Sequence, residues 1–405
     1  MRSVPLPPRI VRRLVIAPGV VLATAALLAA TPLVLLVLAF AVRFIPGRWR
    51  ALRLFWFLLV YLVHESLGIV ALGVLWVLSG FGWRLEDDWS QRAHVALIGW
   101  YLRGLVRAAS RVLGLELVTE AVPADLRVRD GEPGAPASPP RPVLVFSRHA
   151  GAGDSLILVH LLVNAYRRRP HLVLKEELQL APCVDLVLNR VPSRFIGPGR
   201  GRLEGRRRRP GGTDVVASIT ELAAEIEDDG ALILFPEGGN FTERRRRQAI
   251  ERLEAAGFHD AVERAHELTY VLPPRPGGAF AAMDAAPDAD VLFVAHTGLE
   301  QLSSPKDLWA GLPMDREVRL TWWGVHREDI PRDHAERVVW LYEWWERIDT
   351  WIEERRDPDR PATPLVAPEQ PPAPAPAPDG AAAPPTGPPL ADDGVPPVGD
   401  VDVAQ

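Results

Sequence analysis

The 405-residue chain contains one cysteine, Cys183, and only two lysines, Lys175 and Lys306, among its 46 basic residues. A single cysteine excludes a disulfide within the chain, and because no redox or metal motif surrounds Cys183, we interpret it as a small core residue. Arginine supplies nearly all of the positive charge, and its guanidinium group stays protonated and binds phosphate through two hydrogen bonds at once. The formal net charge is −5, so the chain as a whole is not basic, and we expect no nucleic-acid partner.

Two kinds of chemical motif are also missing. The sequence has no Gly-x-Ser-x-Gly nucleophile elbow, which argues against a serine hydrolase. It has no cluster of residues spaced as metal ligands, so we predict neither a metal ion nor a bound cofactor. Hydrophobic residues, in contrast, make up 48% of the chain, and its mean hydropathy of +0.03 is high for a soluble protein.

Much of this hydrophobicity lies in two N-terminal segments. Residues 14–42 contain no charge over 29 positions, and about 20 apolar residues suffice to cross a bilayer. Pro18 and Pro32 interrupt this run, so we expect kinks or a shorter span, and the run is too long for a simple signal peptide. Residues 54–83 form a second run that contains Glu65. Because a charge in mid-membrane costs a few kcal/mol, a re-entrant or interfacial arm is the alternative to a span.

We therefore assign residues 1–88 to a membrane anchor of two hydrophobic segments. Four arginines precede the first run and four separate the two runs, so the positive-inside rule does not choose an orientation. Residues 89–113 follow as an amphipathic helix, in which Arg103, Arg107 and Arg111 recur at every fourth position. Two interpretations of these three arginines are equally supported: contact with a membrane surface, or packing of the helix on the domain with the arginines in solvent.

The rest of the chain predicts one α/β domain over residues 89–356 and a disordered tail, rich in Pro and Ala, over residues 357–405. After a loop at 121–142, apolar runs alternate with helical segments, a pattern typical of a largely parallel sheet flanked by helices. We expect strands at 143–146, 171–174, 231–235, 291–295 and 317–323, helices at 155–166, 214–228 and 243–256, and a last helix from the capping pattern at Asp333 to Arg356. The tryptophans of that helix are expected to pack on the domain, with interfacial anchoring as the alternative.

The first functional motif lies between the strand predicted at 143–146 and the helix that follows it. A Gly-rich turn there contains His149 and Asp154, in a His-x4-Asp spacing. A carboxylate that binds one imidazole nitrogen fixes the tautomer and leaves the other nitrogen free as a base. The alternative is an ordinary helix cap beside a surface histidine, so the spacing alone does not establish catalysis.

The second functional motif follows the strand predicted at 231–235. Pro236-Glu237-Gly238-Gly239-Asn240 makes a tight turn before a helix, and helix N-termini bind anions through their free N–H groups. A glutamate in such a turn also orders nearby groups through hydrogen bonds. Turns of this composition are common, so the motif is weak when it is taken alone.

Together, His-x4-Asp and the later Phe-Pro-Glu-Gly resemble the PlsC-type glycerolipid acyltransferases, the 1-acylglycerol-3-phosphate acyltransferases. Three further stretches look like segments of the same family: residues 173–178, the Phe-Ile pair at 195–196, and residues 272–280. The resemblance covers about residues 90–330. A pair of N-terminal hydrophobic segments is also what that family uses to hold the membrane.

The resemblance implies a membrane-bound enzyme of phospholipid biosynthesis or remodelling. It would move an acyl chain from acyl-CoA to the free hydroxyl of a lysophospholipid, with 1-acylglycerol-3-phosphate as the leading acceptor. His149 would be the general base, Asp154 would hold its tautomer, and Glu237, Gly238 and Gly239 would shape the acceptor site. We also expect contact with membrane lipids, at the cell membrane, with the catalytic domain on the cytoplasmic side.

Two positions depart from the family pattern, because Asn240 and Pro198 stand where the family has arginines linked to the acceptor's phosphate. We expect Arg200 or Arg275 to have taken over, with Lys175 as a further substrate contact. Other arginines that qualify are Arg202 and the runs at 206–209 and 244–247. The alternative acceptors are another lysophospholipid or a glycolipid. The alternatives to acyl transfer are a non-catalytic membrane module with a degenerate site, and a hydrolase that uses activated water.

Overall fold

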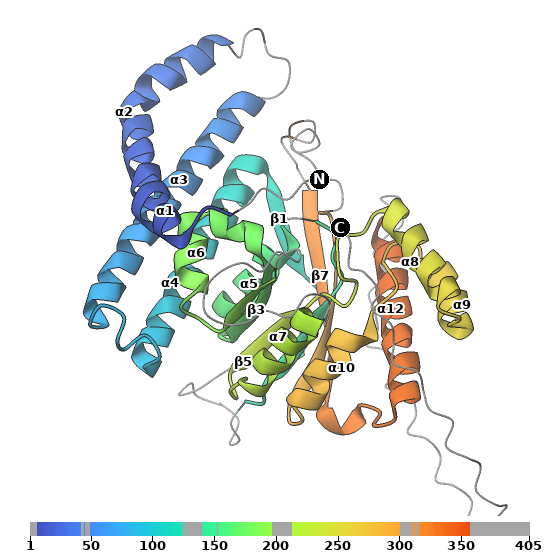
Figure 1. The fold of residues 1–405 in the computed structure, drawn as a ribbon. Coiled ribbons are helices and arrows are strands. Elements are labelled where there is room, and N and C mark those ends of the chain that lie inside the picture. Colours follow the sequence, from blue (N-terminus) through green and yellow to red (C-terminus); the bar gives the residue numbers. More distant parts are fainter. Residues whose placement is uncertain are drawn as a thin grey trace, which may run out of the picture.

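A seven-stranded sheet forms the centre of the protein (Figure 1). The computed structural model describes residues 6–41, 44, 49–123, 126, 140–151, 153–196, 213–299, 309, 312 and 316–356. The strands are β1 (Leu115–Thr119), β2 (Val143–Ser147), β3 (Arg169–Lys175), β4 (Ser193–Ile196), β5 (Gly230–Leu234), β6 (Asp290–Thr297) and β7 (Arg316–Val325). Their order is β1-β7-β6-β2-β5-β3-β4, and all neighbours are parallel except β6 and β7. The predicted α/β fold with a largely parallel sheet is confirmed.

Helices cover both faces of this sheet. Those of the α/β domain are α4 (Asp88–Ala108), α5 (Asp154–Asn164), α6 (Pro182–Leu188), α7 (Thr213–Ala224), α8 (Glu243–Ala255), α9 (His259–Glu267), α10 (Pro276–Ala285) and α12 (His334–Arg356). Alternate residues of β2 point to opposite faces. Val143 and Val145 join a core with α4, α5 and α6, whereas Leu144 and Phe146 join a core with α7, α10 and α12. All five residues of β2 are buried, which explains its continuous apolar sequence.

The long apolar patterns predicted these elements well. The five expected strands correspond to β2, β3, β5, β6 and β7, and the expected helices correspond to α5, α7, α8 and α12. The carboxylate of Asp333 accepts the backbone N–H groups of Ala335 and Glu336 at 2.9 and 3.1 Å, as the capping pattern predicts. Trp345 and Trp351 of α12 are buried, so the packing interpretation of its tryptophans is confirmed. The expected tail at 357–405 lies outside the described residues.

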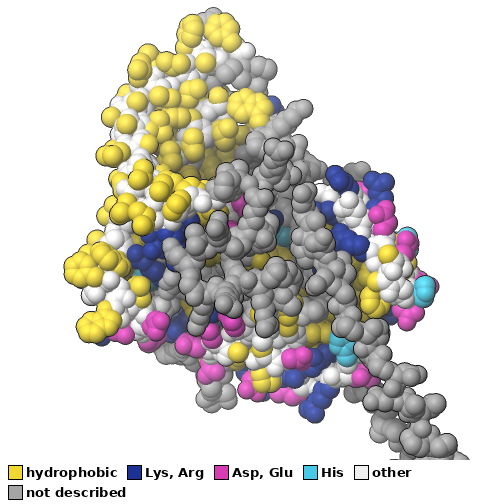
Figure 2. Space-filling view, in the orientation of Figure 1, with side chains coloured by type: hydrophobic (Ala, Val, Ile, Leu, Met, Phe, Trp, Pro, Cys, Tyr) yellow, Lys and Arg dark blue, Asp and Glu magenta, His cyan; other side chains and the backbone are white. Residues whose placement is uncertain are grey.

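The N-terminal region forms two long apolar helices side by side (Figure 1). The first runs from Arg9 to Ala41, through α1 (Arg9–Val11), the π-helical turn η1 (Arg12–Ile16) and α2 (Ala17–Ala41), and the second is α3 (Arg50–Leu78). Pro32 lies inside α2 without ending it, and Figure 1 shows the helix curved. Both helices are long and apolar enough to cross a membrane. Figure 2 shows their hydrophobic side chains exposed over a broad area.

Two buried polar contacts join this anchor to the α/β domain at α6. The guanidinium of Arg12 donates to Gln179 Oε1 and to Asp185 Oδ1, both at 2.8 Å, and Arg12 and Asp185 are almost fully buried. Glu65 of α3, whose charge made a simple span doubtful, is also buried. Its carboxylate accepts the hydroxyl of Tyr101 at 2.7 Å and the backbone N–H of Cys183 at 2.8 Å. These contacts give the buried side chains of Arg12, Asp185 and Glu65 polar partners and connect the two apolar helices to the domain.

The pair between Arg12 and Asp185 gives a first prediction. Asp185→Ala leaves the guanidinium of Arg12 buried without its carboxylate, and removing one partner of a buried pair costs about 3–5 kcal/mol. We expect a clearly lower unfolding midpoint for the full chain in detergent. Glu328→Ala, which removes the exposed partner of Arg141, is the matched control and should change the midpoint little. Equal midpoints for the Asp185 variant and the control would show that the anchor is not held by this pair.

Candidate active site

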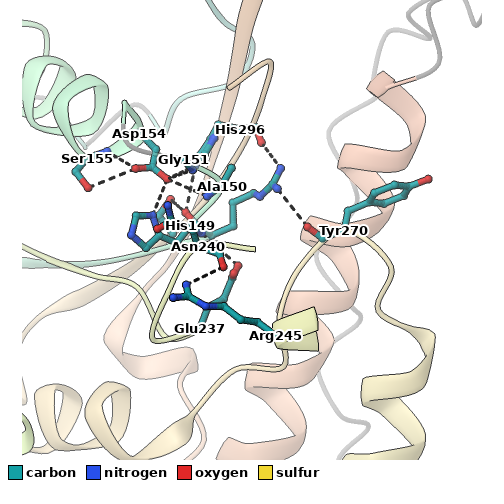
Figure 3. Close-up of polar contacts among 12 residues, drawn as sticks. His149, Ala150, Gly151, Asp154, Ser155, Glu237, Asn240, Arg245, Tyr270 and His296 are labelled. Carbon is teal, nitrogen blue, oxygen red and sulfur yellow. Dashed lines mark hydrogen bonds and ion pairs between the residues drawn. The ribbon is translucent and has the colours of Figure 1, made fainter. Parts of the chain in front are cut away.

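Two turns meet at the carboxyl edge of the sheet, where parallel α/β sheets bind ligands. Strands β2 and β5 are parallel neighbours, and His149 follows the end of β2 while Glu237 follows the end of β5. The backbone N–H of His149 donates to Glu237 Oε1 at 3.3 Å, and the N–H of Phe241 donates to the carbonyl oxygen of His149 at 2.7 Å. Figure 3 shows the two motifs in contact. The sequence had placed them far apart, and the sheet brings them together.

His149 and Asp154 form a direct pair. Nδ1 of His149 lies 2.8 Å from Oδ2 of Asp154, which opens helix α5 (Figure 3). The same carboxylate oxygen accepts the backbone N–H groups of Ala150 and Gly151 at 2.9 and 3.1 Å, and Oδ1 accepts the N–H of Ser155 at 2.7 Å. The Gly-rich turn therefore wraps its own amides around the carboxylate, which an extended chain does not allow.

These contacts fix the protonation of the pair. Burial alone would raise the pKa of Asp154, but the hydrogen bond from His149, the charges of His296 and His149 and the amide of Gly151 outweigh it and lower the pKa below its ordinary value. An ionised Asp154 only accepts, so Nδ1 of His149 carries a proton, and in the neutral imidazole the lone pair is then on Nε2. The imidazole stacks on Phe235 with centroids 4.4 Å apart, and 15% of the His149 side chain is exposed. The ring is therefore held in place with one edge open to solvent.

Sequence reasoning missed two buried residues that support this turn. Arg148 is fully buried and donates to the carbonyl oxygens of His296 at 2.9 Å and Tyr270 at 3.2 Å. Nε2 of His296 lies 3.1 Å from the carbonyl oxygen of Arg148 and 3.9 Å from Oδ2 of Asp154. His296 directly follows the strand predicted at 291–295 and lies near the end of β6, so its place at the carboxyl edge was the one feature that pointed to it.

Glu237 is a buried brace in this structure. Its side chain is 1% exposed, and it accepts the backbone N–H groups of His149 and Leu272. Burial raises its pKa to about 8, although the nearby charge of Arg148 and those two hydrogen bonds act in the opposite direction. The carboxyl group is therefore mostly protonated at neutral pH. It contacts the backbone of the His149 turn from inside the protein, and the role in shaping the acceptor site that the resemblance implies for it stays a prediction.

Arginines surround the outer side of the same turn. Gly238 adopts a φ of +70°, which favours glycine, and a Cβ there would lie 3.0 Å from Nη1 of Arg275, so the guanidinium group packs closely against the turn. A Cβ on Gly239 would lie 2.7 Å from Nη1 of Arg245, which donates to the carbonyl oxygen of Asn240 at 3.2 Å. The sequence pointed to Arg275, and to Arg245 only as one member of a run of four.

The other expected substrate contacts are less close to His149. Lys175 is exposed at the end of β3, on the same edge of the sheet, with β5 between it and β2. No hydrogen bond or ion pair joins it to His149 or Glu237 in the part of the chain that the structure describes. Arg200, Pro198, Arg202 and the run at 206–209 lie outside the described residues. Among the residues that are described, no three His, Cys, Asp or Glu side chains gather as a metal site.

Comparison with known proteins agrees with this geometry. Residues 129–297 match the family model described as Acyltransferase. That segment contains both motifs and the strands β2 to β6. This match supports an acyltransferase of the PlsC-type family over that segment of the chain. Searches of curated proteins and of solved structures returned no match.

The raised pKa of Glu237 predicts a dependence of stability on pH. The ordinary pKa is 4.5 and the folded value is about 8, so folding takes up a proton between these pH values. The contribution of Glu237 to stability is therefore complete below pH 4.5 and is lost as the pH rises through about 8. Glu237→Gln cannot ionise, so we expect its stability to fall less with pH over this interval than that of the wild type.

Unfolding midpoints of both proteins, measured across this interval, check the prediction. Glu328→Gln is the control, because Glu328 is exposed and its pKa is below the ordinary value, mainly through hydrogen bonds from its own backbone and Arg141. Its midpoints should follow those of the wild type. Identical slopes for the wild type and the Glu237 variant would mean that Glu237 is already ionised in the folded protein.

Proposed function

We propose that the protein moves an acyl chain from acyl-CoA to the free hydroxyl of a lysophospholipid, with 1-acylglycerol-3-phosphate as the first candidate. The observation that carries this proposal is the pair of His149 and Asp154, 2.8 Å apart, within the acyltransferase domain. Nδ1 of His149 is occupied by Asp154, and no described residue binds Nε2. An open Nε2 at the edge of the sheet is the base that such a transfer needs.

The proposed reaction uses this geometry in the following way. Nε2 of His149 removes the proton of the acceptor hydroxyl, and the oxygen attacks the thioester carbonyl of acyl-CoA. The new ester bond forms as the carbon–sulfur bond breaks, and the coenzyme A thiolate takes the proton from the imidazolium. The ionised Asp154 stabilises that imidazolium and keeps the ring in the right tautomer. No covalent enzyme intermediate is required, in keeping with the missing serine elbow.

We propose that the anchor enters one leaflet of the cell membrane and holds the domain at its cytoplasmic surface. Two positions along α3 contact the domain: Arg50 at its start donates to the carbonyl oxygen of Leu312 at 2.7 Å, and Arg190 donates to that of Leu72 at 2.8 Å. Contacts with the domain at two separate positions favour a helix that enters one leaflet over a helix that crosses the bilayer. The exposed apolar surface of α2 supports the same arrangement.

For the acceptor's phosphate we propose Arg275 and Arg245. Both guanidinium groups flank the Gly238-Gly239 turn, and the next residues of that turn contact His149 through Phe241. The charge of Arg252 also acts on Arg275, so the region is positive. Among the described residues, no carboxylate pairs with Arg275 or Arg245. Two guanidinium groups without acidic partners fit a phosphate dianion.

A thiol-release assay with acyl-CoA tests the proposed activity. For an acyltransferase, we expect coenzyme A to appear only when a lysophospholipid is added, with an equal amount of diacyl product. Release without acceptor, together with free fatty acid, would indicate a hydrolase. No release with any lysophospholipid or glycolipid acceptor would favour a non-catalytic membrane module.

The pair itself is tested by Asp154→Asn. The amide cannot hold the imidazolium by charge and also disturbs the tautomer, so we expect turnover to fall by roughly 10²-fold or more. The protein should remain folded, since the amide oxygen still accepts from the turn. Ser155→Ala is the control, because its hydroxyl lies 3.4 Å from Asp154 and its backbone N–H is retained. An Asp154 variant as active as this control would contradict the proposed role.

The acceptor site is tested by Arg275→Gln and Arg245→Gln. A charge-assisted contact contributes about 1.5–3 kcal/mol. The KM for 1-acylglycerol-3-phosphate (lysophosphatidate) should therefore rise by roughly ten-fold or more. The KM for acyl-CoA, measured on the same variants, is the internal control and should change little. Arg332→Gln, an exposed arginine near the start of α12, controls for net charge. If only Arg200→Gln raises the KM for 1-acylglycerol-3-phosphate, Arg200 binds the phosphate instead.

A further inference from the structure

Helix α4 has one buried side and one exposed, basic side. Ile98, Tyr101 and Leu102 are buried in the core that α4 shares with α3 and α5. Arg103, Arg107 and Arg111 are exposed; the last lies in η2 (Ala109–Leu113), the π-helical continuation of α4. We call these three residues the basic stripe. The sequence left open whether it meets a membrane or only solvent.

No acidic residue that the structure describes pairs with the basic stripe. In the described part of the chain, Arg107 and Arg111 make no hydrogen bond or ion pair, and Arg103 contacts only the side-chain oxygen of Asn164, at 2.5 Å. The arginines near the start of α4 differ. Arg92 pairs with Asp88, and the guanidinium of Arg169 contacts the carboxylates of Asp88, Glu227 and Asp229. Uncompensated charge is thus confined to the C-terminal half of the helix.

That half of α4 borders the apolar anchor. A groove of about 420 Å³ lies between them, and Arg111 lines it together with Leu35 of α2 and with Leu52 and Trp56 of α3. Further along α4, Trp100 stacks on His64 of α3 with ring centroids 5.1 Å apart. Both Trp56 and Trp100 remain more than a third exposed. The basic stripe therefore adjoins apolar surface with two exposed tryptophans at the boundary.

This order of apolar surface, tryptophan and cation matches the cross-section of a membrane interface. Apolar side chains meet acyl chains, tryptophan is favoured at the level of the headgroups, and arginine meets lipid phosphates. We propose that Arg103, Arg107 and Arg111 form a docking face for the phosphate groups of anionic lipids. This face would make attachment of the enzyme depend on the lipid composition of the membrane, and it is independent of the acceptor's phosphate site.

Vesicle binding of the full chain tests this docking face. Protein in detergent is transferred to vesicles of phosphatidylcholine, or of phosphatidylcholine with an equal amount of phosphatidylglycerol, and the bound fraction is measured by flotation. We expect tighter binding to the anionic vesicles, and we expect added salt to remove the difference. A double variant with Arg107→Gln and Arg111→Gln should lower the ratio of binding to anionic over neutral vesicles by roughly fivefold for each arginine. Neither residue has a hydrogen-bond or ion-pair partner among the described residues, so the fold should be unaffected.

Two controls separate charge from position. Replacing Arg107 and Arg111 with lysine keeps the charge and should keep most of the preference for anionic vesicles. Arg332→Gln removes an exposed arginine elsewhere and should change nothing. An unchanged preference in the double glutamine variant would overturn the proposal, and so would an equal loss of binding to both kinds of vesicle. Because binding is measured without acyl-CoA, the result stands or falls separately from acyl transfer.

Discussion

The hydrogen bond between His149 and Asp154 depends on a carboxylate that stays ionised although its side chain has no exposed surface. Burying such a charge is costly unless donors surround it. Here the backbone amides of residues 150, 151 and 155 and the imidazole itself provide four donors. The turn after β2 must therefore keep one conformation, and much of the surrounding structure serves that requirement.

A second buried carboxyl group, that of Glu237, also helps to hold that turn. Unlike the ionised Asp154, it is protonated. Its pKa is raised to about 8, first by burial and in smaller part by the charge of Asp154. One site thus contains two carboxyl groups with different pKa values. Asp154 is surrounded by four hydrogen-bond donors, whereas Glu237 accepts mainly from two backbone amides. The neutral group braces the His149 backbone, and the ionised group orients the imidazole. If Asp154 were protonated and Glu237 ionised, the imidazole of His149 would lose the carboxylate that fixes its tautomer.

The sequence predicted the parts of this arrangement that depend on local pattern. The apolar run of β2, the Gly-rich turn and the spacing from His149 to Asp154 are all visible within one short segment. Short elements such as β4, α6 and α9 were missed, because four to nine residues carry little periodicity. The buried pair of Arg12 and Asp185 joins residues far apart in the chain, and apolar periodicity does not reveal a polar partner. The same limit hid Arg148 and His296, and left Arg245 one among four neighbours until α8 was placed beside the turn.

The proposed activity depends on Nε2 of His149 as the base of an acyl transfer. The most direct measurement compares coenzyme A release by the wild type and by His149→Ala, both bound to the same vesicles, with acyl-CoA and a lysophospholipid. The alanine variant removes the base and leaves the anchor unchanged, so release should fall by roughly 10²–10⁴-fold while vesicle binding stays the same. Release at the wild-type rate by the alanine variant would contradict the account.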